Sequence, residues 1–240
     1  MNESPPTESQ SSGSLRVDLA IRHPECWIID VSSETDVGVL GRGVYRTSER
    51  RANSHVTVFG DRRSVLDEAI GVARASAHTA AVAEMTGSGE HTVPVAPGKA
   101  SRELLVEHDP TKQVSDAFTS RGFVYGAPVD IRDGVEHWTL FTHEDRHAIR
   151  TALDEVRDSA AAKVELVGIS AADTRSGEGS LPLYRLSARQ REVFQLARRR
   201  GYYTHPKETT ASDLAEKLGV TTSTVHEHLR KAEQELLNLA

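Results

Sequence analysis

Apolar and polar residues alternate along much of the first two thirds of the chain, and this period of two predicts β-strands. From Leu15 to Ile21 every second side chain is apolar. Further strands are predicted at residues 54–61, 79–85, 103–108, 123–142 and 162–169. The segment 123–142 is interpreted as a hairpin, because Asp133-Gly134 is a typical type I′ turn sequence.

Between these strands the spacing of apolar residues changes to about 3.6, which is typical of amphipathic helices. Helices are predicted at residues 62–76, 109–122 and 144–161. The first has an apolar stripe made of Val65, Leu66, Ala69, Ile70 and Ala73. The second begins with Asp109-Pro110, which fits a capped first turn. Residues 23–38 are rich in β-branched side chains, so helix and strand both remain open there.

The order of these predicted elements repeats about 80 residues apart. Val44-Tyr45 precedes Thr-x-Phe and a helix in the first copy, and Val124-Tyr125 does so in the second. The repeat predicts an α+β body made of tandem βαββαβ units, ferredoxin-like or ACT-like, with halves at about 15–86 and 102–170. In such a unit two helices cover one face of an antiparallel sheet.

Composition marks the boundaries of the predicted domains. Residues 1–14 are rich in Ser, Pro and Glu without any period, which predicts a disordered tail. Residues 171–182 are rich in Gly, Ser and charged side chains, which predicts a linker between the body at 15–170 and a second domain at 183–240.

The last sixty residues contain start signals for three helices. Ser187 is followed by Gln190 in a capping-box spacing, Thr210 can cap a second helix that ends at Gly219, and Thr221 can cap a third. The third helix has an apolar stripe made of Val225, Leu229, Ala232 and Leu236. Two short helices joined by a tight glycine turn predict a helix-turn-helix, with an ordinary helical hairpin as the alternative.

Charge separates the two predicted domains. The whole chain has a net charge of −6, but residues 181–240 hold ten basic and seven acidic side chains and the remainder has a net charge of −9. The carboxy-terminal domain therefore fits contact with nucleic acid, and the acidic body fits a different task.

Residues 186–237 resemble the bacterio-opsin activator-type helix-turn-helix domain, which is typical of transcription regulators of halophilic archaea. The matching motifs are LSARQREVFQLA, Gly201-Tyr202-Tyr203 with Pro206, Asp213-Leu214-Ala215, Leu218-Gly219-Val220 and the run from Ser223 to Glu233. The resemblance implies sequence-specific binding of double-stranded DNA. The body resembles the amino-terminal regions of such regulators only loosely, so no role for it is implied.

The third helix, residues 221–237, is predicted to be the recognition helix in the major groove. Ser223, Glu227 and Arg230 lie about 140° to 200° from Val225 around the helix axis and are expected to face the bases. The full predicted DNA-binding set is Thr222, Ser223, Thr224, His226, Glu227, Arg230 and Lys231. Within it, Lys231 is expected to contact the DNA backbone.

One motif points to a different chemistry. His143-Glu144-Asp145-Arg146-His147 has the spacing of zinc metallopeptidases, in which two histidines on one helix bind the metal. With Thr142 as the helix cap, His143 lies in the first turn and His147 lies about 200° from the apolar Ile149. The geometry does not favour a metal here, so we expect no enzyme, no metal and no cofactor.

Cys26 is the single cysteine and has no partner for a disulfide or a thiolate metal site. Beside Trp27 it is interpreted as a packing residue, and redox sensing is the alternative. Packing is preferred because no resolving thiol or activating base is evident in the sequence. The glycines of GVLGRG at 38–43 lack a phosphate-loop lysine and are interpreted as turn residues.

No apolar run approaches the roughly 20 residues that span a bilayer, so we expect a cytoplasmic protein without membrane contact. The sequence predicts a DNA-binding transcription regulator that acts as a homodimer. Its amino-terminal module would bind a small-molecule effector or assemble the protein. The alternative is an ACT-like small-molecule or protein-interaction module without direct DNA readout.

Overall fold

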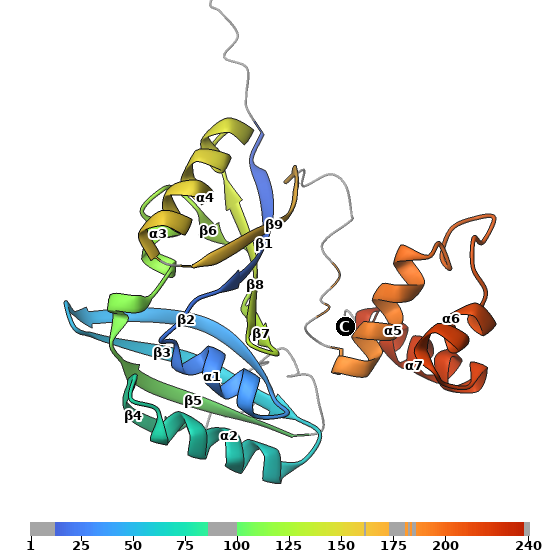
Figure 1. Ribbon diagram of the computed structural model, residues 1–240, viewed down its shortest axis with the longest axis horizontal. Helices are drawn as coiled ribbons and strands as arrows, with labels where there is room; N and C mark the ends of the chain where they lie inside the picture. The colour runs from blue at the N-terminus through green and yellow to red at the C-terminus, as the bar shows by residue number, and fades with distance from the viewer. Residues whose placement is uncertain are drawn as a thin grey trace, which may run out of the picture.

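The computed structural model describes residues 13–85, 100–160, 162–172, 181, 183 and 186–237 (Figure 1). The predicted tail 1–14 and linker 171–182 therefore lie almost entirely outside the described residues. The elements of the body are β1 (Leu15–Arg22), α1 (Trp27–Glu34), β2 (Gly38–Ser48), β3 (Arg51–Gly60), α2 (Arg63–Ala75), β4 (Thr79–Glu84), β5 (Ala100–His108), a 3-10 turn (Pro110–Lys112), α3 (Ser115–Thr119), β6 (Val124–Tyr125), β7 (Val129–Arg132), β8 (Val135–Thr142), α4 (Arg146–Ala160) and β9 (Lys163–Ala171). They are followed by α5 (Ala188–Arg199), α6 (Ala211–Leu218) and α7 (Thr222–Leu237).

The described part of the body is an α+β fold built on one antiparallel sheet. Its strand order is β4-β5-β3-β2-β7-β8-β1-β9, with β6 paired to β8 off this path. Helices α1 and α2 pack on the strands at the β4 end of this order, and α3 and α4 pack on those at the β9 end (Figure 1). Each end therefore has its own apolar core.

The two halves exchange their first strands. Strand β1 lies between β8 and β9 of the second half, with Leu19 opposite Trp138, and β5 lies between β3 and β4 of the first half, with Val56 opposite Leu104. The predicted halves at 15–86 and 102–170 therefore do not each form a sheet from their own strands alone. Alternation along a strand predicts which face is buried, but it does not identify the neighbouring strand.

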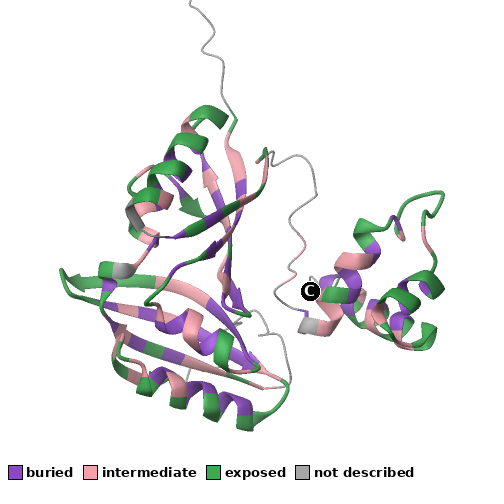
Figure 2. Cartoon of the chain, viewed as in Figure 1, coloured by how far each residue is buried: buried purple, intermediate pink, exposed green. Residues whose placement is uncertain are grey.

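Several local predictions for the body are confirmed. Val17, Leu19 and Ile21 of β1 are buried, and so are all five stripe residues of α2 (Figure 2). The ambiguous segment 23–38 contains helix α1, which buries Trp27 and Val31 against the first core. Packing of this apolar stripe outweighs the weak helix propensity of β-branched residues. Asp133 and Gly134 both have positive φ, at 52° and 68°, as a type I′ turn requires.

Two predictions of secondary structure in the body are wrong. The predicted helix 109–122 is broken into a 3-10 turn, whose start is capped by Asp109, and the short helix α3. The segment GVLGRG lies in strand β2 and not in a turn. A Cβ atom at Gly38 would come within 2.1 Å of Cζ of Phe59, so this glycine makes room for an aromatic ring.

The carboxy-terminal helices form a three-helix bundle with the predicted caps. Ser187 Oγ accepts a hydrogen bond from the backbone N–H of Gln190 at 3.3 Å, and the backbone N–H of Ser187 donates one to Gln190 Oε1 at 2.9 Å. Thr210 and Asp213 form a second capping box at the start of α6. The core of the bundle is apolar and includes Val193, Leu214, Val225, Leu229 and Leu236.

A small buried network joins this bundle to the body. Asp130 of β7 pairs with Arg191 of α5, and Arg132 Nη2 donates to the carbonyl oxygen of Leu186 at 3.1 Å. Asp130 and Arg132 are both buried and also pair with each other at 3.0 Å. Burial lowers the pKa of Arg132, while Asp130 acts against this by favouring its charged form.

None of the helices in the described residues is long and apolar enough to span a membrane.

Candidate nucleic-acid interface

A three-residue turn fixes α7 against α6. Gly219 ends α6 in the left-handed conformation, with φ of 64°, and the backbone N–H of Val220 donates to the carbonyl of Ala215 at 3.0 Å. Thr221 Oγ1 then accepts from the backbone N–H of Thr224 at 3.2 Å, which caps α7 as predicted. A glycine allows this backbone conformation without strain, and the two helices form a helix-turn-helix.

Helix α7 has one buried face and one exposed face. Val225, Leu229, Ala232 and Leu236 are buried in the bundle core. The residues predicted to contact DNA lie outside this stripe: Thr222, Ser223, His226, Glu227, Arg230 and Lys231 are exposed and Thr224 is partly exposed. The structure therefore brings all seven together on the solvent-facing side of one helix.

Charge on the exposed face is partly paired. Lys231 Nζ donates to Glu227 Oε1 at 2.6 Å, one helical turn away, and this hydrogen bond lowers the pKa of the Glu227 carboxyl. Arg230 forms no ion pair within the described part of the chain. Its guanidinium is thus the side chain of this face best able to bind an external acceptor.

Sequence reasoning missed a second basic feature of this domain. Arg198, Arg199 and Arg200 are three consecutive exposed cations at the end of α5. The loop that follows them is held to α7 by Tyr203, whose hydroxyl donates to Glu233 Oε1 at 2.7 Å. The run of three arginines was the available signal, because such runs are typical of patches that contact phosphates.

The metallopeptidase-like spacing at 143–147 does not lie on one helix. Thr142 is not the helix cap, because Asp145 Oδ1 accepts from the backbone N–H groups of His147 and Ala148, both at 2.8 Å. Helix α4 begins at Arg146, so His143 precedes it. The two histidines therefore lack the relation that the zinc motif requires.

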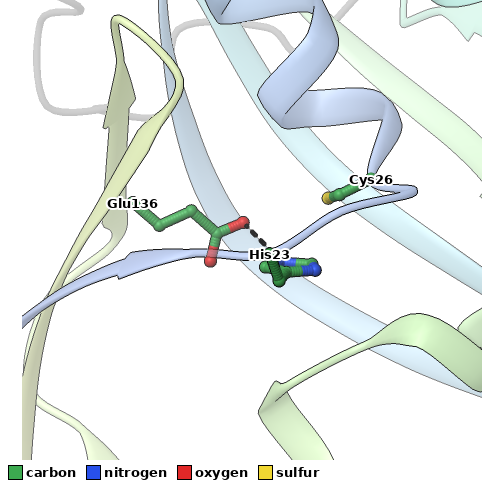
Figure 3. Close-up of side chains that lie close together, drawn as sticks. All are labelled: His23, Cys26 and Glu136. Carbon is green, nitrogen blue, oxygen red and sulfur yellow. Dashed lines mark ion pairs between the residues drawn. The ribbon is translucent and has the colours of Figure 1, made fainter. Parts of the chain in front are cut away.

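A different cluster lies in the body. Ligand atoms of His23, Cys26 and Glu136 all lie within 4.8 Å of one another (Figure 3). Burial acts to lower the pKa of His23, but hydrogen bonds with Cys26 and Glu136 outweigh it and raise that pKa to about 10. The interpretation that Cys26 has no base beside it is thus wrong. The H-x-x-C spacing was the available signal, but Glu136 is more than a hundred residues away in the sequence.

Two family models match the chain. Residues 186–238 match a family described as an HTH DNA binding domain. Residues 16–161, more than half of the chain, match the HVO_2525_N family, described as an amino-terminal domain.

Curated relatives come from two halophilic archaea. The transcriptional regulator NarO of Haloferax volcanii is 39% identical over 78 residues, which is 31% of this chain and 37% of NarO. A second Haloferax volcanii protein, whose description includes the words transcriptional regulator, is 33% identical over 131 residues, which is 51% of this chain and 22% of that protein. The dimethyl sulfoxide reductase transcriptional activator of Halobacterium salinarum is 38% identical over 74 residues, which is 29% of this chain and 33% of the activator. The chain thus spans between 22% and 37% of the length of these relatives.

Proposed function

Because this chain belongs to the HVO_2525_N family and carries a helix-turn-helix DNA-binding domain, we propose that it regulates transcription by binding specific sequences of double-stranded DNA. The observation that carries this proposal is the exposed polar face of α7, which a rigid turn and a buried stripe hold outward. The names of the relatives, which describe regulators and an activator of transcription, support it.

In this proposal α7 enters the major groove and its side chains divide the task. Arg230 is suited to two hydrogen bonds with guanine, and Glu227 to accepting one from cytosine. Lys231 would contact a phosphate, and this would release the Glu227 carboxylate from its present pairing with Lys231. Thr222, Ser223, Thr224 and His226 lie near the start of the helix, where backbone N–H groups also favour a phosphate.

We further propose that the protein binds DNA as a homodimer. A single helix-turn-helix buries too little DNA surface for tight specific binding, so two half-sites about one helical turn apart are expected. The end of α7 offers a contact for a second copy, since Leu237 is 74% exposed. Light scattering at micromolar concentration, with and without DNA, tests this, and a monomer in both conditions contradicts it.

For the body we propose a role in sensing or assembly that reaches the DNA-binding domain through Asp130, Arg132 and Arg191. The buried pairing of Asp130 with Arg191, and the bond from Arg132 to the Leu186 carbonyl, support this role because they are direct contacts between the two domains. An interaction module without DNA contact remains the less favoured alternative, because it leaves the exposed face of α7 without a task.

We also propose that the body descends from two βαββαβ units. In each half of the sheet the strand order fits such a unit if the first strand is taken from the other half. Strands β2 and β7 are then the corresponding edge strands of the two units, and their pairing joins the units into one sheet.

Salt-dependent DNA binding tests the proposed function most directly. Genome-wide occupancy of the tagged protein would identify a bound sequence, and fluorescence anisotropy would then measure its affinity over a series of salt concentrations. Each phosphate contact is expected to add about −0.9 to the slope of log affinity against log salt. Random DNA of equal length is the control. Equal affinity for both sequences, or binding that does not change with salt, contradicts the proposal.

A further inference from the structure

We propose that His23, Cys26 and Glu136 bind a divalent transition-metal ion of the zinc type, with one coordination position open to an adjacent cavity. This site lies in the body, and the inference does not depend on the proposed DNA binding.

The three side chains come from two segments that are far apart in the sequence (Figure 3). His23 and Cys26 lie in the connection between β1 and α1, and Glu136 lies on β8. Their donor atoms, one nitrogen, one sulfur and one oxygen, all lie within 4.8 Å of one another. A shift of about 1 Å in each side chain brings all three to metal-ligand distances of about 2.0–2.3 Å from one point.

Local structure explains why His23 and Cys26 converge. Glu25 between them has a left-handed backbone, with φ of 58°, which turns the chain sharply before α1 begins. Cys26 is the residue immediately before this helix. Strand β1 is extended up to Arg22, and the turn that follows places the Cys26 sulfur beside the His23 imidazole.

Two of the three side chains are buried and Cys26 is partly exposed, which separates the site from a chance cluster on the surface. His23 is only 7% exposed, and its Nδ1 is a buried polar atom without a hydrogen-bond partner in the described part of the chain. Glu136 is 6% exposed, and its Oε2 accepts a hydrogen bond from Trp138 Nε1 at 2.8 Å. The indole therefore fixes the carboxylate so that Oε1 faces His23 at 3.5 Å, as groups that orient metal ligands do.

The chemistry of the donors selects the class of metal. Imidazole, thiolate and carboxylate together suit zinc and neighbouring ions such as cobalt, whereas calcium and magnesium prefer oxygen ligands alone. Binding forms bonds from the metal to nitrogen, sulfur and oxygen, and the thiol proton of Cys26 and any proton on His23 pass to solvent. Three protein ligands leave a fourth tetrahedral position for water or another small ligand.

The structure provides space for that fourth ligand. A cavity of about 210 Å³ is lined by all three proposed ligands, and other parts of its wall come from Trp27, His108 and Tyr125. Part of the wall is apolar and part can form hydrogen bonds, which is typical of small-molecule sites. The open position of the metal would thus face a space that admits more than one water molecule.

Cobalt titration of the full chain, after treatment with a chelator, tests this inference without DNA. We expect one Co²⁺ per chain and a near-ultraviolet charge-transfer band from thiolate to cobalt, which Zn²⁺ removes by displacement. Cys26→Ser should abolish the band. Glu136→Gln keeps a hydrogen-bond acceptor for Trp138 but removes a charged ligand. It should weaken metal binding at least about tenfold, because losing a group that only orients a ligand already costs about that much affinity.

The matched control is the His143→Gln, His147→Gln double variant, which removes the two histidines of the metallopeptidase-like spacing and should bind Co²⁺ like the parent. Circular dichroism checks that each variant is folded. The proposal is overturned if the parent shows no charge-transfer band, if folded Glu136→Gln binds as tightly as the parent, or if the double variant loses binding.

Discussion

The DNA-binding domain and the body are stabilised in different ways. In the domain, α5, α6 and α7 follow one another closely in the sequence and share one core. In the body, Asp18 of β1 accepts a hydrogen bond from Thr139 of β8, a partner 121 residues away, and each half depends on a strand from the other. The contacts that stabilise the domain are therefore mostly local in sequence, whereas strand exchange joins the two halves of the body in one sheet.

The two regions also differ in what they bury. Every polar or charged residue that is buried in the described part of the chain lies in the body, and these include His23, His108, Asp130, Arg132 and Glu136. The core of the DNA-binding domain is apolar, and the polar residues in its described part are exposed or partly exposed. Ionisable groups with perturbed pKa values cluster at functional sites, so the buried groups of the body support the proposed role in sensing or assembly.

The largest expected effect comes from dividing the chain. Residues 183–240 alone and residues 1–175 alone should each fold, and the second fragment should bind no DNA. Residues 13–85 alone should not fold, because β3 and β4 lose their shared neighbour β5 and β1 loses both of its partners. Thermal unfolding followed by circular dichroism distinguishes these outcomes. Cooperative unfolding of the 13–85 fragment would show that strand exchange is not required.

A substitution in the core of the bundle should affect one region only. Leu229→Ala removes a buried side chain of α7 and is expected to cost about 2–5 kcal/mol of unfolding free energy in the DNA-binding domain. The unfolding transition of the body should stay in place. Calorimetry measures both transitions. Gln234→Ala, at an exposed position on the same helix, is the matched control and should change stability by less than about 0.5 kcal/mol.

A smaller effect is expected on the exposed face of α7. Arg230→Ala should lose about 1–3 kcal/mol of binding free energy on the specific site and relax base preference at one position. Lys231→Ala should weaken binding to specific and random DNA alike, because a phosphate contact carries no base preference. Arg63→Ala, an exposed position on α2 of the body, is the matched control. If folded Arg230→Ala binds both DNAs as the parent does, this face does not read the bases.

These differences explain which features could be predicted from the sequence. The helix caps of the DNA-binding domain, the turn at Gly219 and the stripe of α7 depend on residues a few positions apart, so the sequence predicted them together with the exposed set on α7. The neighbours of β1 and β5 depend on contacts across the whole body, and alternation does not encode them. The cluster of His23, Cys26 and Glu136 was missed for the same reason, since strand pairing brings Glu136 to the other two.

The smallest expected effect is on the pH dependence of the body. Burial lowers the pKa of His108 below its ordinary value, although the neighbouring Asp109 acts in the opposite direction. The neutral ring contacts Ser54 Oγ at 2.8 Å. A histidine with a lowered pKa stabilises the fold above its ordinary pKa of about 6.5, and this contribution is lost as the pH falls from there through the folded-state pKa. The unfolding free energy of the body should therefore fall more steeply below about pH 6.5 in the parent than in His108→Gln, which does not titrate. Denaturant unfolding between about pH 5 and 8 measures both slopes, and equal slopes would show that His108 does not contribute.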